Sequence, residues 1–148
     1  MQELIELFER HHVQYAMVGG YAVNYYGYMR TTQDIDLLIN PTRENAKKVM
    51  RCLKEFGFGE ADIPIEYFEH AGSAIHLGVE PNRIDLLTHL RGVSNERIFG
   101  NKEKVTIEGI SVDIISLEDL LDAKRSSKRL KDQADAEELE KRGEDMNS

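Results

Sequence analysis

The sequence predicts a single domain of the α/β (α+β) class, with a small mixed β-sheet flanked by helices. Along the chain, short stretches with alternating apolar and polar residues, as in strands, are interspersed with stretches that carry apolar residues at helical spacing. The 148 residues suffice for one compact core and leave no room for a second domain of ordinary size. Two of the strand-like stretches carry aspartates among Ile and Leu, which predicts an acidic pocket in the sheet.

Composition excludes several classes of protein. The content of 41% hydrophobic and 31% charged residues is ordinary for a globular domain, and no apolar run approaches the ~20 residues needed to cross a bilayer. The opening segment carries Glu3, Glu6 and Glu9, unlike a signal peptide, and the single Cys52 excludes disulfides and cysteine metal clusters. We therefore expect a cytoplasmic protein. The net charge of −8 argues against a broad nucleic-acid surface, which is normally basic.

The first half of the chain reads helix, strand, turn, helix, strand, helix. An amphipathic stripe opposite the glutamates predicts the first helix, and a proline and a following glycine bound the last one. The expected elements are a helix at 2–12, a strand at 15–18, a short helix at 21–26, a strand at 35–39 and a helix at 43–56. The last helix is expected to cover the sheet and to lead, by a right-handed crossing, to a later strand.

The second half has shorter elements. A glycine turn at Glu108-Gly109 separates two alternating runs and predicts a hairpin, and Ser116 is the expected cap of one final helix. The expected elements are a helical turn at 65–68, strands at 75–79 and 83–87, a turn or short helix at 92–100, and hairpin strands at 105–107 and 110–115. We expect the domain to comprise residues 1–139 and residues 140–148 to form a charged, frayed tail.

Gly19-Gly20 follows the first strand and precedes a helix. Glycines let the backbone turn sharply and approach a ligand closely, and the first amides of the helix would favour an anion. This arrangement predicts a place for phosphate groups.

Asp34 and Asp36 lie on one face of the strand at 35–39, because side chains two residues apart in a strand point the same way. Two carboxylates this close are unfavourable unless a cation binds them. A divalent metal ion fits this requirement. For an isolated Asp-x-Asp, neutralisation by Arg30 or a distant Lys, or an edge strand with that face in water, is the simpler explanation, but the glycine turn and helix before it favour a site for a metal-bound phosphate chain.

Asp85 places another acid in an apolar strand. Arg83, on the same face, is either its structural partner or the neighbour of a third metal-binding carboxylate. Farther along, a basic stretch places Lys124, Lys128 and Lys131 on one helical face, which taken alone is typical of a solvated surface.

Residues 15–139 resemble the nucleotidyltransferase superfamily of DNA polymerase β in its minimal form. The resemblance is carried by the order of motifs: Gly-Gly, a short helix, Arg-Thr-Thr-Gln and then Asp-x-Asp. The sequence is most similar to small bacterial nucleotidyltransferases of the abortive-infection toxin type. The resemblance implies the nucleotidyltransferase fold and Mg²⁺- or Mn²⁺-dependent transfer of a nucleoside monophosphate from a nucleoside triphosphate to an acceptor hydroxyl.

The resemblance also implies roles for individual residues. Asp34, Asp36 and Asp85 would be catalytic and hold the metal ions, with Asp85 helping to deprotonate the acceptor. The residues implied in nucleotide binding are Gly19, Gly20, Arg30, Thr32, Lys124 and Asp132.

The acceptor is left open among RNA, protein and a small molecule, and so is a partner protein in a toxin–antitoxin pair; no membrane partner is expected. Two other classes of function stay open. One is a binding module with the transferase fold that serves as a regulatory or antitoxin partner, although intact acids at all three positions count against it. The other is a phosphohydrolase that uses the same acids.

Overall fold

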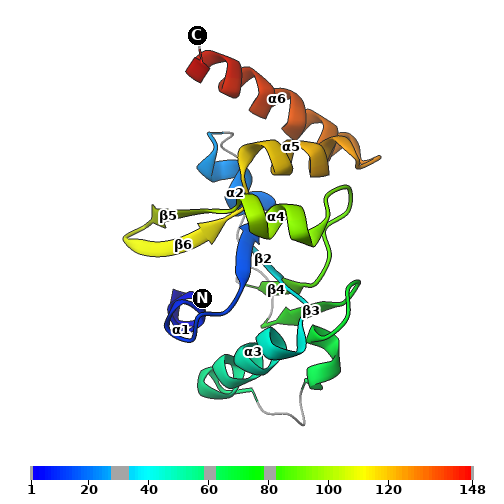
Figure 1. The fold of residues 1–148 in the computed structure, drawn as a ribbon. Helices are drawn as coiled ribbons and strands as arrows, with labels where there is room; N and C mark the ends of the chain where they lie inside the picture. Colours follow the sequence, from blue (N-terminus) through cyan, green and yellow to red (C-terminus); the bar gives the residue numbers. More distant parts are fainter. Residues whose placement is uncertain (1, 28–33, 59–62, 79–82, 148) are drawn as a thin grey trace.

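The computed structural model describes residues 2–27, 34–58, 63–78 and 83–147, and the side chains up to residue 142. Within these residues helices and strands alternate in much the order that the sequence predicts (Figure 1). In chain order they are α1 (Gln2–Arg10), β1 (Tyr15–Val18), α2 (Gly19–Tyr25), β2 (Ile35–Ile39), α3 (Arg43–Phe56), the 3-10 helix η1 (Ile65–Phe68), β3 (Ala74–Leu77), β4 (Ile84–Leu87), α4 (Asn95–Asn101), β5 (Glu103–Ile107), β6 (Ile110–Ile114), α5 (Leu117–Arg125) and α6 (Leu130–Asn147).

The described strands form one mixed sheet in the order β3-β4-β2-β1-β6-β5. β1 is antiparallel to β2 and parallel to β6, while β2 is parallel to β4. The edge strands β3 and β5 are each antiparallel to their neighbour. The parallel pairing of β2 with β4 through α3 is the crossover that the sequence predicts, so the predicted α/β (α+β) class with a small mixed sheet is confirmed.

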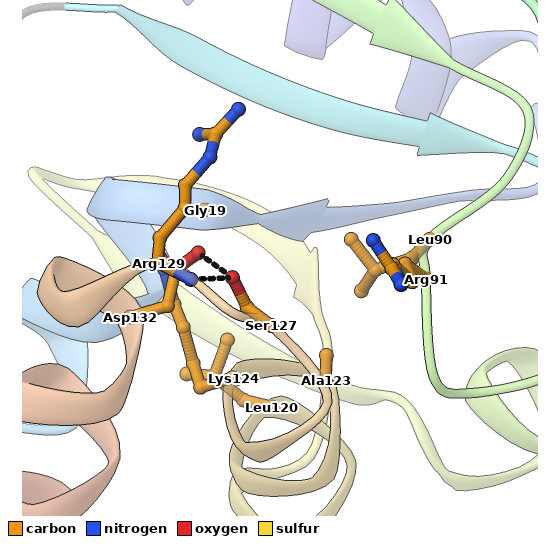
Figure 2. Close-up of a pocket in the computed structure, with 9 residues that line it drawn as sticks. All are labelled: Gly19, Leu90, Arg91, Leu120, Ala123, Lys124, Ser127, Arg129 and Asp132. Atoms are coloured by element: carbon orange, nitrogen blue, oxygen red, sulfur yellow. Dashed lines mark hydrogen bonds and ion pairs between the residues drawn. The ribbon is translucent and has the colours of Figure 1, made fainter.

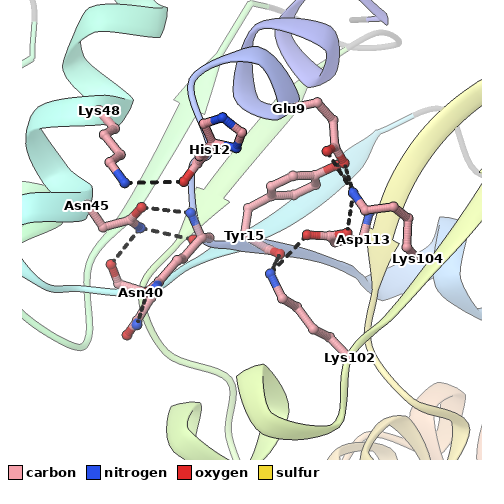
Figure 3. A network of polar contacts seen from close by, with 10 residues as sticks. Glu9, His12, Tyr15, Asn40, Asn45, Lys48, Lys102, Lys104 and Asp113 are labelled. Carbon is pink, nitrogen blue, oxygen red and sulfur yellow. Dashed lines mark hydrogen bonds and ion pairs between the residues drawn. The ribbon is translucent and has the colours of Figure 1, made fainter.

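β1 and β2 form the centre of the core, since every residue of β1 and all of β2 except Asp36 are buried. α1 packs against α3 below the sheet in Figure 1, and α5 packs against α6 above it. Tyr15 ties β1 to two other elements: its hydroxyl donates to Glu9 of α1 at 2.8 Å and accepts from the backbone N–H of Asp113 in β6 at 3.1 Å (Figure 3).

α3 has the predicted bounds and is fixed to the sheet by a buried asparagine. Thr42 caps the helix by accepting from the N–H of Asn45, and Gly57 ends it with a φ of 112°. The Asn45 amide accepts from Gln14 N–H at 2.7 Å and donates to the carbonyls of Gln14 and Asn40, both at 2.9 Å (Figure 3). The start of β1 and the end of β2 are thereby held together, which sets the register at their other ends, where the site lies.

The C-terminal region is two helices where the sequence predicts one. α5 begins as expected, with Ser116 accepting from Asp119 N–H, but it ends at Arg125 and α6 begins at Leu130. Serine side chains compete with the helix backbone at this break: the Ser126 hydroxyl donates to the Asp122 carbonyl and the Ser127 hydroxyl accepts from Arg129 N–H. The predicted single basic face of Lys124, Lys128 and Lys131 is therefore wrong.

α6 continues through Asn147, so the described part of the predicted frayed tail is helical. Of the helices in the described residues, none combines the length and the apolar character required to span a membrane.

Candidate functional site

Gly19 brings the chain into direct contact with the acidic strand. It follows Val18, which pairs with Asp36 in the antiparallel register, and it has a φ of +68°. A β-carbon on Gly19 would overlap Oδ2 of Asp36 and lie 2.9 Å from its Cγ. A glycine is therefore required here for both conformation and space. α2 begins at Gly19 itself, two residues before the start that the sequence predicts, and Gly20 is buried.

Three acids gather where β2 and β4 run side by side. Asp36 and Asp85 are register partners in these parallel strands, and Asp34 immediately precedes β2. Arg83 contacts Asp34 and Asp85. Its backbone N–H donates to Asp34 Oδ1 at 3.2 Å, and its guanidinium lies 3.8 Å from Asp34 Oδ2 and 2.8 Å from Asp85 Oδ1. Asp34, Asp36 and Asp85 thus lie together on one side of the sheet; their catalytic roles stay predictions.

The charges of the acids are unequally compensated. Burial, followed by the neighbouring carboxylates of Asp85 and Asp34, raises the pKa of Asp36 to about 6, against a smaller opposing effect of Lys124. Burial also acts to raise the pKa of Asp85, but hydrogen bonds from His76 and Arg83 outweigh it and hold the pKa below its usual value. Asp36 is therefore the acid that gains most from an added cation.

Both oxygens of Asp85 are engaged by protein groups. Arg83 donates from Nε to Oδ1 at 2.8 Å and from Nη2 to Oδ2 at 3.1 Å, and His76 Nδ1 lies 2.6 Å from Oδ1. Arg83 is thus the partner of Asp85, one of the two alternatives that the sequence leaves open. In the described part of the chain, no three His, Cys, Asp or Glu side chains are arranged to hold a metal ion.

The residue types nevertheless suit a divalent cation. Carboxylate oxygens are the donors that Mg²⁺ and Mn²⁺ prefer, and three carboxylates face one guanidinium and one histidine. Asp34 and Asp36 fit such an ion in this arrangement. Asp85 fits it less readily, because Arg83 donates to both of its oxygens.

A pocket of about 330 Å³ lies beside Gly19, and Figure 2 shows the residues that line it. It lies between the end of the β4 segment and the α5–α6 corner. Its lining residues are Gly19, Leu90, Arg91, Leu120, Ala123, Lys124, Ser127, Arg129 and Asp132. Because Gly19 both lines the pocket and touches Asp36, the acids and the pocket form one continuous site.

Lys124 and Asp132, two residues that the resemblance singles out, meet in this pocket. Lys124 Nζ lies 2.9 Å from Asp132 Oδ1 and 3.3 Å from Asp135 Oδ2. Asp132 also accepts from the Ser127 hydroxyl at 2.6 Å; this bond and the Lys124 charge overcome the effect of burial and lower its pKa. Lys124 is only 13% exposed, so it belongs to a buried ion-pair cluster and not to the solvated surface.

Sequence reasoning missed the arginines of the pocket. Arg91 comes from the loop after β4 and Arg129 from the α5–α6 corner. In the sequence, only the glycine that follows Arg91 hints at this loop. Gly92 has a φ of +91°, and a β-carbon there would overlap Ser126. Of the other predicted residues, Gly20 does not line the pocket, and Arg30 and Thr32 lie outside the described residues.

A sequence profile described as aminoglycoside-2''-adenylyltransferase matches residues 1–139. No curated protein matches the sequence.

Three solved structures have a similar fold and low sequence identity to this chain. One is the lincosamide antibiotic adenylyltransferase LnuA, lincomycin-bound, with 19% identity, a TM-score of 0.57, and coverage of 93% of this chain and 92% of that one. Another is ANT(2'')-Ia in complex with adenylyl-2''-tobramycin, with 12% identity, a TM-score of 0.58, and coverage of 93% and 83%. A third is an antigenic nucleotidyltransferase-like protein from Paracoccidioides brasiliensis, with 15% identity, a TM-score of 0.57, and coverage of 95% and 72%. The predicted nucleotidyltransferase fold is confirmed by these similarities.

Proposed function

The chain belongs to the aminoglycoside-2''-adenylyltransferase family, and we propose that it transfers a nucleoside monophosphate from a nucleoside triphosphate to a hydroxyl group of a small molecule. The observation that carries this proposal is the position of Gly19, which joins three carboxylates to a pocket with cationic side chains. Carboxylates suit the metal-bound end of a triphosphate, and cations suit its free phosphate oxygens.

In this proposal each part of the site has a separate task. Asp34 and Asp36 would hold Mg²⁺ or Mn²⁺, which would supply charge neutralisation at the triphosphate. Lys124, Arg91 and Arg129 bind phosphate oxygens in the pocket, and the absence of a side chain at Gly19 allows the phosphates close to the backbone.

The transfer step uses Asp85 as the proton acceptor. The acceptor hydroxyl oxygen bonds to the α-phosphorus as the bond from that phosphorus to the bridging β-phosphate oxygen breaks. The hydroxyl proton passes to Asp85 after Arg83 has released a carboxylate oxygen, since the bound guanidinium holds the pKa of Asp85 below its usual value, and pyrophosphate leaves. His76, which contacts Asp85 Oδ1, keeps the carboxylate turned toward the other acids.

A small-molecule acceptor is favoured by two of the similar structures, which contain lincomycin and adenylyl-2''-tobramycin. A net charge of −8 also suits a polycationic acceptor better than RNA. An RNA or protein acceptor, a toxin–antitoxin role, a partner protein and a cytoplasmic location stay predictions from the sequence.

The test uses each α-labelled nucleoside triphosphate with Mg²⁺ and, separately, a panel of aminoglycosides and lincosamides or a total extract of RNA and protein. We expect label to move to one class of small molecule, with one pyrophosphate released per transfer. Label in RNA or protein would contradict the proposed acceptor. Free monophosphate without a labelled acceptor would indicate a hydrolase, and no pyrophosphate with any triphosphate would indicate a binding module.

Lys124→Ala is expected to weaken nucleotide binding and also to destabilise the fold, by about 1–3 kcal/mol. The sequence alone predicts an unchanged folding midpoint on the premise that Lys124 is exposed, and this premise is wrong. Lys124 is 13% exposed and pairs with Asp135, which is 1% exposed, so its removal takes a cationic partner away from that buried carboxylate. Urea melts and equilibrium binding of a triphosphate measure the two effects.

A second substitution separates the two roles of Lys124. Asp135→Asn in the Lys124→Ala background is expected to restore stability without restoring nucleotide affinity, while Lys128→Ala, at an exposed position, should change neither. If the double variant binds nucleotide as tightly as the parent, Lys124 is a structural residue only.

A further inference from the structure

Arg83 contacts two of the three acids. It donates to both oxygens of Asp85, and its Nη2 also lies 3.8 Å from Asp34 Oδ2. With His76 Nδ1 also 2.6 Å from Oδ1, a cation that bridges Asp85 to the other acids would have to bind at Oδ2, directly beside the guanidinium charge. Bidentate pairing of this kind is the strongest contact between a guanidinium and a carboxylate.

We propose that Arg83 is an internal counter-ion that competes with the divalent metal for Asp85, and that Arg83 must release Asp85 before a metal ion can bind all three acids. This inference rests on the proposed function, because it takes the acid cluster as the metal site. It adds a positioning residue that controls when the third acid becomes available.

The difference in burial between the two partners favours such a release. The Arg83 side chain is 30% exposed and is therefore less confined than the carboxylate that it pairs with. Asp85, by contrast, is 9% exposed and is also held by His76 at 2.6 Å. When Arg83 leaves, Asp85 therefore keeps one protein partner and its place beside Asp36.

The charges make the exchange a competition. A divalent ion and a guanidinium within a few ångströms of each other repel strongly in a partly buried site. Three carboxylates with Arg83 in place carry less net negative charge than the same carboxylates without it, so Arg83 lowers the affinity for the metal. Removal of its charge should raise that affinity, whereas a purely structural Arg83 would have the opposite effect, since its loss would disorder Asp85.

The test measures binding of Mn²⁺ alone to the full chain, by the loss of the electron paramagnetic resonance signal of free Mn²⁺. Arg83→Gln, which keeps an N–H donor but is shorter and uncharged, is expected to bind Mn²⁺ at least about tenfold more tightly than the parent. Arg83→Lys should fall between the two. Arg10→Gln, which removes a positive charge from the exposed end of α1, should change affinity by less than about twofold.

Asp36→Asn in each background tells the two hypotheses apart. Tighter binding by Arg83→Gln that is lost with Asp36→Asn supports the role of Arg83. Equal or weaker binding by both Arg83→Gln and Arg83→Lys, still sensitive to Asp36→Asn, overturns that role and leaves the metal site intact. If neither the parent nor the Arg83 variants show Mn²⁺ binding that depends on Asp36, the metal site and the role of Arg83 both fail.

Discussion

Asp36→Asn is expected to reduce nucleotide transfer by more than about a hundredfold, without loss of stability in the metal-free protein. The activity is lost because Asp36 is a proposed metal ligand, and loss even of an outer partner of a ligand typically costs 10–100-fold. Stability is retained or increased because Asn has nearly the same shape and removes repulsion from Asp34 and Asp85. Pyrophosphate release and thermal melts in chelator, with and without Mg²⁺ and nucleotide, measure both effects.

The stability difference between the variant and the parent should depend on pH. Burial and the neighbouring acids raise the pKa of Asp36 to about 6 in the folded protein, above its ordinary value near 4. Between these two values the folded state binds more protons than the unfolded state, so the parent loses stability as pH rises through this range. Asp36→Asn lacks that loss, and its advantage should be full above about pH 6 and absent below about pH 4.

Asp122→Asn is the matched control. Asp122 accepts from Arg97 Nη2 at 2.7 Å and has no role in the proposed site. Its replacement should therefore lower stability slightly and leave transfer unchanged. If Asp36→Asn instead melts well below the parent in chelator, and both respond equally to Mg²⁺, then Asp36 is a structural acid and the site is misplaced.

Gly19→Ala is expected to destabilise the fold by about 2–4 kcal/mol and to reduce transfer by about a hundredfold. The alanine would have to adopt a φ of +68°, and its methyl group would overlap the Asp36 carboxylate. Asp36 would then move away from Asp34 and Asp85, so even the folded fraction of the variant should transfer poorly. Chemical denaturation and initial rates corrected for the folded fraction test this.

Gly109→Ala supplies the comparison for backbone strain. Gly109, in the hairpin between β5 and β6, has a φ of +82°, and a β-carbon there meets no atom within 4 Å. This variant should lose about 1 kcal/mol and keep full activity. Equal losses in the two variants would mean that only strain, and not contact with Asp36, makes Gly19 necessary.

Strand periodicity was sufficient to place the acids on common faces. The alternation around Asp34, Asp36 and Asp85 predicts which side chains share a face within each strand, and β2 and β4 have almost the predicted bounds. That β2 and β4 are neighbours, with Asp36 opposite Asp85, is not contained in either strand's pattern. Pairing across a long connection depends on the packing of the whole chain, and only the family resemblance indicated it.

The late basic stretch shows why charge patterns alone mislead. Lys124 and its neighbours have the composition of a solvated face, yet the break at Ser126 and Ser127 turns α6 back so that Asp132 and Asp135 cover Lys124. Hydrogen bonds between two serine hydroxyls and the backbone thus end the helix, and the end of the helix decides which of the later charges are buried. Arg83 is a related case. The sequence shows that Arg83 is near Asp85, but it does not show whether Asp85 pairs with this guanidinium or binds a metal ion.

The parallel contact between β1 and β6 has a consequence for the protein during its synthesis. Met17 pairs with Ile114, so the strand that precedes Gly19 gains its β6 neighbour only after residue 114 has been synthesised. Asp34, Asp36 and Asp85 all emerge from the ribosome before Lys124, Arg129 and Asp132. A nascent chain can therefore have its three carboxylates before it has the pocket that we propose for the triphosphate.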